Sequence, residues 1–433
     1  MDALAKESAS LADWLSYLEV LHPKVIDMGL ERIDRVRAVL DLFPKFPVII
    51  VGGTNGKGSV CTMLESILQS AGYKVGCYTS PHLLHYNERI RINKINIDDR
   101  NLCNAFAQID AARKQCDISL TYFEFGTLAA MHCFMEAQVD VAIMEIGLGG
   151  RLDAVNIFDP DCAILTSVEL DHIDYLGDTR EKIGFEKAAI FRSTKPAVYA
   201  DSNIPHSVSQ YAEKINAQFI RFEEEFGYIN KGDQWDFWGL LGERRSLPFP
   251  ALRGEKQLQN ASACLAALDS LRELLPVKMS DIRQGLLDAV IPGRFQVVST
   301  QPMIILDVAH NPSAAVVLSN NLQATKSIGK TYAVVAMLQD KDILGVVQSL
   351  KKDIDYWLVS TVKSPRAASA DFLLQQIYHS GINNTDQCVK FDDCVAAFVF
   401  ACEQASKDDR ICVFGSFYTV SEILHFMKTA HSR

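Results

Sequence analysis

Short apolar runs alternate with segments of helical periodicity along the first half of the chain. The runs at 47–53, 139–147 and 162–168 are almost continuously apolar, which is typical of strands covered on both faces of a parallel sheet. The segment 57–71 instead carries apolar residues at helical spacing. Strands that alternate with helices predict a doubly wound α/β domain with a mostly parallel sheet.

Two features interrupt this alternation of strands and helices. Residues 225–250 are aromatic, charged and rich in turn formers, which predicts a small β excursion. Pro292 and Gly293 then punctuate the chain, and the alternation of strands and helices restarts behind them. We therefore predict a first α/β domain over 1–295 and a second, smaller, Rossmann-like α/β domain over 296–433, which is a normal domain size.

The composition narrows the possible functions. The net charge of −10 argues against a broad surface for nucleic acid. The eleven cysteines contain no CxxC pair and are typical of reduced thiols in a cytoplasmic protein. The longest apolar run, Cys394–Cys402, is roughly half as long as a membrane-spanning helix must be. We expect a cytoplasmic protein that binds neither nucleic acid nor membrane.

A glycine-rich loop joins the apolar run 47–53 to the helical segment 57–71. Its sequence, VGGTNGKGSV, indicates a phosphate cradle in which backbone N–H groups and Lys57 face an anion. The loop departs from the usual pattern because Gly58 stands where a hydroxyl residue normally follows the lysine. The alternative is a glycine turn with a solvated lysine. The candidate ATP-binding residues here are Thr54, Asn55, Gly56, Lys57, Gly58 and Ser59.

Candidate metal ligands follow three of the predicted strands. Ser80 stands in a Ser-Pro turn, Glu145 ends a buried strand, and His172 follows the next strand. Ligands bind at the carboxyl ends of parallel strands, and a hard cation prefers oxygen ligands. The alternatives are an ordinary turn at Ser80, a Glu145 that pairs with Arg151, and a structural histidine.

Lys187 lies in the apolar helical stretch GFEKAAIF. Most lysines are solvated, but the neighbours of this one predict a buried helix. A buried lysine needs a partner.

These stretches, taken in order, resemble the Mur ligase superfamily over nearly the whole chain. Within it they are similar to the folylpolyglutamate synthases and their bifunctional dihydrofolate synthase relatives. The segments that carry the resemblance are IDMGLERI, GTNGKGS, TSPHL, DISLTYFEFGTL, EIGLGGRLDAVN, LDHIDYLG, EKAAIF, PGRF, DVAHNP, MLQDKD and FGSFYTV.

The resemblance implies roles for individual residues. Two magnesium ions, with K⁺ or another monovalent cation as a further possibility, would be held near Ser80, Glu145 and His172, and Lys187 would be carbamylated. Asn260, Arg294 and Asp307 would bind the nucleotide. His310 and Ser416 would lie on the glutamate side, and the candidate catalytic residues are Lys57, Lys187 and His310. The residues implied for pteroate binding are Asp27, Thr121, Tyr122, Phe123, Glu124, Leu152, Asp153 and Ala154.

The resemblance also implies the reaction, an ATP-dependent joining of L-glutamate to dihydropteroate and to reduced folates through an acyl phosphate. The stretch DISLTYFE favours the bifunctional enzyme, and we expect a monomer. Other readings stay open: a ligase for folates alone, another amide ligase of the superfamily, a nucleotide-driven switch, or a non-catalytic relative.

Overall fold

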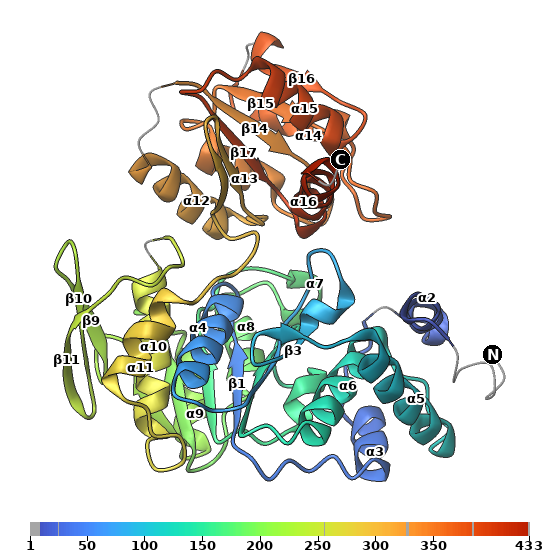
Figure 1. Ribbon diagram of the computed structural model, residues 1–433, viewed down its shortest axis with the longest axis vertical. Coiled ribbons are helices and arrows are strands. Elements are labelled where there is room, and N and C mark those ends of the chain that lie inside the picture. Colours follow the sequence, from blue (N-terminus) through green and yellow to red (C-terminus); the bar gives the residue numbers. More distant parts are fainter. Residues whose placement is uncertain (1–8, 25, 255, 326–328, 383–384, 432–433) are drawn as a thin grey trace. The chain divides into compact units, whose positions relative to one another are not determined.

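The computed structural model describes residues 9–24, 26–254, 256–325, 329–382 and 385–431. These residues divide into two compact units (Figure 1). The first lies within Met1–His82, Tyr86–Ala251 and Leu258–Ala289, and the second within Leu83–His85, Leu252–Gln257 and Val290–Arg433. Each unit has its own sheet and its own hydrophobic core.

The first unit is built on an eight-stranded sheet with the order β4-β3-β2-β5-β1-β6-β7-β8. Strands β2, β5, β1, β6, β7 and β8 run parallel, while β3 and β4 add an antiparallel edge. The strands are β1 (Val48–Gly52), β2 (Val75–Tyr78), β3 (Ile90–Ile92), β4 (Ile95–Asn96), β5 (Val141–Glu145), β6 (Cys162–Leu165), β7 (Pro196–Tyr199) and β8 (Gln218–Arg221). The predicted mostly parallel α/β sheet is confirmed.

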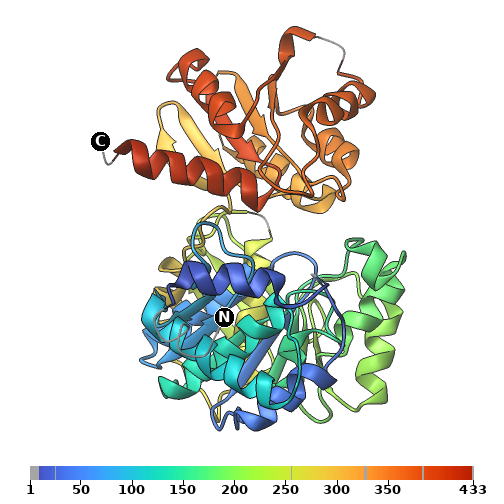
Figure 2. The ribbon, with the colours of Figure 1, turned by 90° about the vertical axis from the view of Figure 1, so that its right-hand side faces the viewer.

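Helices cover both faces of this sheet (Figures 1 and 2). The helices of the first unit are α2 (Leu11–Leu21), α3 (Glu31–Val39), α4 (Lys57–Ser70), α5 (Asp99–Gln115), α6 (Tyr122–Glu136), α7 (Ile173–Leu176), α8 (Arg180–Ala188), α9 (His206–Lys214), α10 (Gln257–Ser270) and α11 (Met279–Leu287). Two 3-10 turns, η1 (Tyr86–Arg89) and η2 (Ala154–Ile157), lie in the connections.

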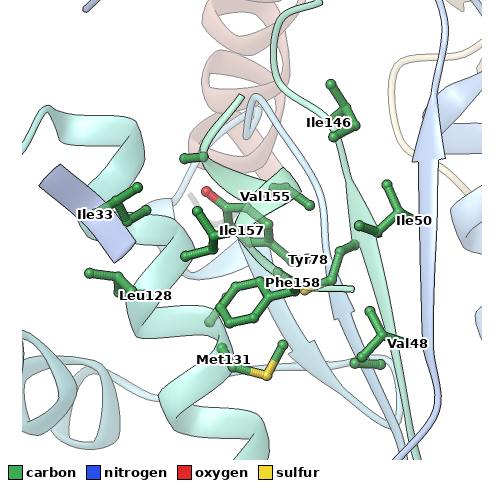
Figure 3. Close-up of a cluster of buried hydrophobic side chains, with 14 of the residues drawn as sticks. Ile33, Val48, Ile50, Tyr78, Leu128, Met131, Ile146, Val155, Ile157 and Phe158 are labelled. Atoms are coloured by element: carbon green, nitrogen blue, oxygen red, sulfur yellow. The ribbon is translucent and has the colours of Figure 1, made fainter. Parts of the chain in front are cut away.

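Alternating side chains of β1 separate the two faces, because successive residues of a strand point in opposite directions. Val48 and Ile50 enter the core formed with α3 and α6, where they face Ile33, Leu128 and Met131 (Figure 3). The intervening residues of β1 are equally buried, and α4 packs against β1, β2 and β5. The central strand is therefore covered on both sides, as its continuous apolar sequence predicted.

The β excursion predicted over 225–250 is a three-stranded antiparallel sheet with the order β11-β10-β9. Its strands are β9 (Gly227–Asn230), β10 (Trp235–Gly239) and β11 (Gly242–Leu247). Arg244 of β11 pairs with Asp269 of α10, so the small sheet is fastened to the helix that follows it.

The second unit has a six-stranded sheet with the order β12-β13-β17-β14-β15-β16, in which only the β12 edge is antiparallel. Its strands are β12 (Gln296–Thr300), β13 (Met303–Leu306), β14 (Thr331–Val335), β15 (Tyr356–Val359), β16 (Cys388–Lys390) and β17 (Arg410–Phe414). Its helices are α12 (Pro312–Ala324), α13 (Ile343–Leu350), α14 (Ala370–His379), the 3-10 turn η3 (Thr385–Gln387), α15 (Cys394–Gln404) and α16 (Phe417–His431). The predicted second α/β fold is thus confirmed.

The longest apolar run lies within α15, a helix of 11 residues. Among the residues that the structure describes, no helix combines the length and the apolarity that crossing a bilayer requires.

Candidate active site

The glycine-rich loop links the end of β1 to the first residue of α4, Lys57. Gly53 and Gly56 have φ angles of 138° and 90°, in the region that L side chains rarely adopt. A Cβ on Gly53 would lie 1.9 Å from Thr166 Oγ1, and one on Gly56 would lie 2.9 Å from Asn260 Oδ1. The glycines are required both for the turn and for the close approach of these two side chains. The structure thereby brings Asn260 of α10 against the loop.

The segment after β6 braces the same loop. Thr54 N donates to Ser167 O at 2.8 Å, and Asn55 N donates to Ser167 Oγ at 3.1 Å. Glu169 N donates to Thr54 Oγ1 at 3.0 Å. These bonds hold the loop in place directly before α4. The first turn of α4 contains Lys57, Gly58 and the buried Ser59. A helix N-terminus offers backbone N–H groups that lack intrahelical acceptors, and these groups suit a phosphate.

Two lysines converge on this loop. Lys57 Nζ donates to Gly53 O at 3.0 Å and to Thr54 O at 3.2 Å. Lys187 Nζ, from α8, donates to Gly53 O at 3.0 Å. Burial and the nearby Lys57 charge lower the pKa of Lys187 to about 7. The buried helix predicted for Lys187 is present, and the amine of Lys187 donates to a carbonyl of the glycine-rich loop.

Ser80 and Glu145 lie in direct contact at the carboxyl ends of β2 and β5. Ser80 N donates to Glu145 Oε2 at 3.0 Å, and Glu145 is buried. Arg151 does not pair with Glu145. It instead forms two-atom contacts with Glu186 at 3.0 to 3.2 Å. The alternative reading in which Arg151 neutralises Glu145 is therefore wrong, because the loop after β5 turns Arg151 toward α8.

His172 is the N-cap of the short helix α7, in the segment that follows β6, with a φ of 51°. Its Nε2 lies 3.9 Å from Asp171 Oδ2. Within the described residues, no three His, Cys, Asp or Glu side chains are grouped as a metal cage. The buried Glu145 carboxylate beside Ser80 nevertheless fits magnesium, since Mg²⁺ takes one or two carboxylates and keeps water or phosphate oxygens as its other ligands.

The start of α6 carries the stretch TYFE. Thr121 is its N-cap, and Thr121 and Glu124 form a capping box in which Thr121 N donates to Glu124 Oε2 at 2.7 Å. Arg32 joins this buried carboxylate to the segment before α3. Its Nη2 donates to Glu124 Oε1 at 3.0 Å, and its Nη1 lies 2.8 Å from Asp27 Oδ2. Asp27 is thereby held beside the start of α6.

Aromatic side chains surround the same helix start. The ring centroid of Phe123 lies 6.0 Å from that of Tyr78, and the ring of Tyr122 lies 5.5 Å from that of Tyr86. Gly147, after β5, leaves room for Phe123, because a Cβ there would lie 2.5 Å from Phe123 Cζ. The position of the Phe123 ring therefore depends on a glycine.

The loop Leu152–Ala154 also belongs to the first unit. Asp153 is buried and accepts hydrogen bonds from Leu148 N at 2.8 Å and Val155 N at 3.0 Å. Burial raises the pKa of Asp153 to about 6, and the charge of Lys187 opposes the rise. The predicted pteroate-binding loop therefore lies within electrostatic range of the lysine.

Two predicted residues of the second unit, Arg294 and His310, lie near the ring of Phe417. The guanidinium carbon of Arg294 lies 5.5 Å from the centre of the Phe417 ring, and the His310 ring centroid lies 6.5 Å from it. Asp307 accepts hydrogen bonds from Phe295 N and Ala309 N, both at 2.8 Å. Burial raises the pKa of Asp307, and Arg294 opposes that rise. Ser416 is the residue before Phe417 in the sequence. Its Oγ lies 2.7 Å from Thr419 Oγ1, at hydrogen-bond distance.

Sequence patterns did not single out several residues that shape the site. Thr166 and Ser167 brace the glycine-rich loop, Arg32 holds Asp27, and Phe417 packs against Arg294 and His310. The position of Thr166 and Ser167 directly after a buried strand was the available signal, since it is the same signal that marked Glu145.

Comparison with known proteins identifies the family. Residues 51–268 match the Mur ligase middle domain, and residues 293–417 match the Mur ligase glutamate ligase domain. The chain belongs to the Mur ligase family. This Mur ligase is 44% identical to the dihydrofolate synthase/folylpolyglutamate synthase of Escherichia coli (strain K12) over 98% of its own length and 97% of that protein. That identity places it in the dihydrofolate synthase/folylpolyglutamate synthase branch of the family.

Solved structures agree with this placement. The Mur ligase is similar to E. coli FolC in complex with DHPP and ADP, with a TM-score of 0.93, 43% identity, and coverage of 98% of this chain and 99% of that one. It is also similar to a bifunctional folylpolyglutamate synthase/dihydrofolate synthase with Mn, AMPPNP and L-glutamate bound, with a TM-score of 0.90, 43% identity and the same coverage.

Proposed function

We propose that the chain is an ATP-dependent ligase that joins L-glutamate to dihydropteroate, giving dihydrofolate, and to reduced folates, giving polyglutamates. The observation that carries this proposal is its 44% identity, over 98% of the chain, to a protein with both activities in its name. The phosphate loop, the Ser80–Glu145 contact and the pteroate-side residues all lie in the first unit and support the same reaction.

The reaction begins with a carboxylate, which is a poor acyl donor. Transfer of the γ-phosphoryl group of ATP converts it to an acyl phosphate, and the amine of glutamate then attacks and displaces phosphate. Phosphoryl transfer depends mostly on positioning and on neutralising charge. In this chain the loop amides and the first turn of α4 hold the phosphates. Lys57 moves from its two carbonyl acceptors to the phosphate oxygens, because a doubly charged oxyanion competes well with neutral carbonyls.

Magnesium would be held by Ser80, Glu145 and His172. We predict two magnesium ions per site. K⁺ or another monovalent cation is a further candidate requirement. Bound Mg²⁺ would neutralise phosphate charge during transfer. A similar solved structure that contains manganese with AMPPNP supports a divalent ion beside the nucleotide.

Lys187 is proposed to act as a carbamate. An unmodified ammonium would place a second positive charge on the Gly53 carbonyl beside Lys57. Because the pKa of Lys187 is lowered to about 7, a large fraction of the amine is neutral at physiological pH, and only the neutral amine reacts with carbon dioxide. The carbamate reverses the local charge and supplies oxygen atoms toward the metal.

The remaining roles stay proposals. In the first unit, dihydropteroate would contact Asp27, Thr121, Tyr122, Phe123, Glu124, Leu152, Asp153 and Ala154. The nucleotide would also contact Asn260, Arg294 and Asp307. Glutamate would lie toward His310 and Ser416, and His310 is the candidate acceptor of the amine proton. The assignment of 1–295 to ATP binding and 296–433 to glutamate ligation, a monomeric state and a cytoplasmic location are likewise predictions.

An assay with separate substrates tests the function. The protein is incubated with ATP, magnesium and L-glutamate, together with dihydropteroate in one reaction and tetrahydrofolate in another, and ADP and the amide product are measured. We expect products in both reactions and no ADP release without glutamate. Product from tetrahydrofolate alone would indicate a ligase for folates only. Steady hydrolysis of ATP in the absence of both dihydropteroate and tetrahydrofolate would favour a nucleotide-driven switch.

A further inference from the structure

A buried ion pair, Glu65–Arg91, connects α4 and β3 near the segment that leads to Ser80. Glu65 lies on α4, two turns after Lys57, and only 1% of its surface is exposed. A buried carboxylate is costly unless it is paired and hydrogen-bonded. Arg91 of β3 supplies the pairing: its Nε lies 3.0 Å and its Nη2 lies 2.8 Å from Glu65 Oε2. The guanidinium thus fastens strand β3 to the helix that begins at the phosphate loop.

The other donors of Arg91 reach the segment that leads to Ser80. Arg91 Nη1 donates to Thr79 Oγ1 at 2.9 Å and to Glu88 O at 3.1 Å, and Nη2 contacts Cys77 Sγ at 3.2 Å. Thr79 immediately precedes Ser80, whose own N–H donates to Glu145. One rigid planar group therefore connects α4 to the residue next to the proposed metal ligand.

We propose that Arg91 is a positioning residue that sets the place of Ser80 relative to the phosphate loop, acting through Thr79 and anchored by Glu65. This inference rests on the proposed function, because it takes Ser80 as a metal ligand. Arg91 needs the fork geometry of its guanidinium for this task, since a lysine ammonium cannot hold a carboxylate with two parallel bonds and reach a hydroxyl from the same plane.

Positioning and stability can be separated at this pair. Removing Arg91 alone would strand the buried Glu65 carboxylate and destabilise the fold. Replacing both partners with apolar residues of similar size is often neutral for stability, but it also removes the link to Thr79. Changing Thr79 alone cuts that link and leaves the ion pair intact.

The experiment measures binding of Mn²⁺ in the presence of AMPPNP, with free Mn²⁺ followed by electron paramagnetic resonance, together with the melting temperature of each variant. Thr79→Val and the double variant Glu65→Leu/Arg91→Leu are compared with Thr79→Ser, which keeps the hydroxyl. We expect Thr79→Val and the double variant to bind Mn²⁺ about three- to tenfold more weakly, a loss of about one charged hydrogen bond at most. Thr79→Ser should match the parent, and all melting temperatures should stay close to the parental value.

Ser80→Ala separates this inference from the proposed function. If Ser80→Ala weakens Mn²⁺ binding while Thr79→Val and the double variant bind as the parent does, Arg91 does not position Ser80 and the inference is overturned. If Ser80→Ala itself binds Mn²⁺ as the parent does, the metal assignment is wrong and the inference is overturned together with it. If Thr79→Ser is as weak as Thr79→Val, the hydroxyl is not the link and the inference is again overturned.

Discussion

The ammonium groups of Lys57 and Lys187 donate to the same carbonyl oxygen, that of Gly53, each at 3.0 Å. One lysine begins α4 and the other lies 130 residues later in α8. Burial is the main cause of the lowered pKa of Lys187, and the repulsion between the two cations on one neutral acceptor lowers that pKa further. The repulsion between the two side chains is removed if Lys187 loses a proton, and it becomes an attraction if the charge of Lys187 changes sign.

Stability should therefore depend on pH through Lys187. Its folded pKa of about 7 lies below the ordinary value of 10.5, so the unfolded chain binds the extra proton between these values. The free energy of unfolding should rise with pH across that window, and the full penalty should be present at and below pH 7. Lys187→Met removes the penalty and should stabilise the protein by about 1 to 3 kcal/mol at pH 7, with a smaller gain near pH 10.

Urea denaturation in buffer free of carbon dioxide, at pH 7 and at pH 9.5, measures this difference. Lys182→Met is the matched control, because Lys182 lies on the same helix, is exposed and pairs with the exposed Asp178. Its effect should be small at both pH values. An equal stabilisation by Lys187→Met at both pH values would show that burial of the charged amine is not the cause.

Lys187→Ala should lose most ligase activity, because the site then lacks the proposed carbamate. Acetate at high concentration should restore part of the activity by supplying a carboxylate in the vacated space, whereas Lys187→Arg should stay inactive with or without acetate. Product formation from dihydropteroate and L-glutamate is the measurement. Parental activity of Lys187→Arg would mean that the residue acts as a simple cation.

Lys57→Ala should fold normally and lose activity by at least about a hundredfold at saturating ATP, since one preorganised charge on the transferring phosphoryl group is worth that much. The melting temperature should change little, because the side chain of Lys57 donates to the loop carbonyls of Gly53 and Thr54 and to no other group that the described residues show. Turnover within a few-fold of the parent would contradict the assignment of this loop to the phosphates of ATP.

Gly147→Ala should impair the use of dihydropteroate. The added methyl would lie 2.5 Å from Phe123 Cζ, so the ring must move. Both Gly147→Ala and Phe123→Ala should raise the KM for dihydropteroate about tenfold, the value of one aromatic contact, and leave the KM for ATP nearly unchanged. Phe125→Leu is the control, because Phe125 lies on the same helix but is fully buried in the core. It should lower the melting temperature without a selective effect on dihydropteroate.

The sequence predicted the elements whose pattern is long and regular. The apolar run around Ile50 and the periodic segment after Lys57 became β1 and α4 almost at the expected bounds, because strands buried on both faces and amphipathic helices each have a distinct spacing. Strands β3 and β4, of three and two residues, were not predicted, since segments this short are defined by their partners and not by their own pattern.

The sequence predicted many of the individual residues of the candidate site, but few of the contacts between them. Ser80 and Glu145 were marked by their places at strand ends, and their meeting follows from the pairing of β2 with β5. The shared acceptor of Lys57 and Lys187 could not be predicted, because it depends on how α8 packs against a loop far away in sequence. The Glu65–Arg91 pair escaped notice for the same reason: each residue alone resembles an ordinary surface charge.

The place of β1 in the middle of its sheet has a consequence for how the chain folds. Ile49 pairs with Ile143 on one side and with Cys162 on the other, so both neighbours of β1 are synthesised roughly a hundred residues after it, and such distant pairings form slowly. The loop that follows β1 is braced only once β6 and the segment behind it are in place. A growing chain should therefore gain affinity for ATP late and abruptly, and nucleotide binding during synthesis would report when the central sheet is complete.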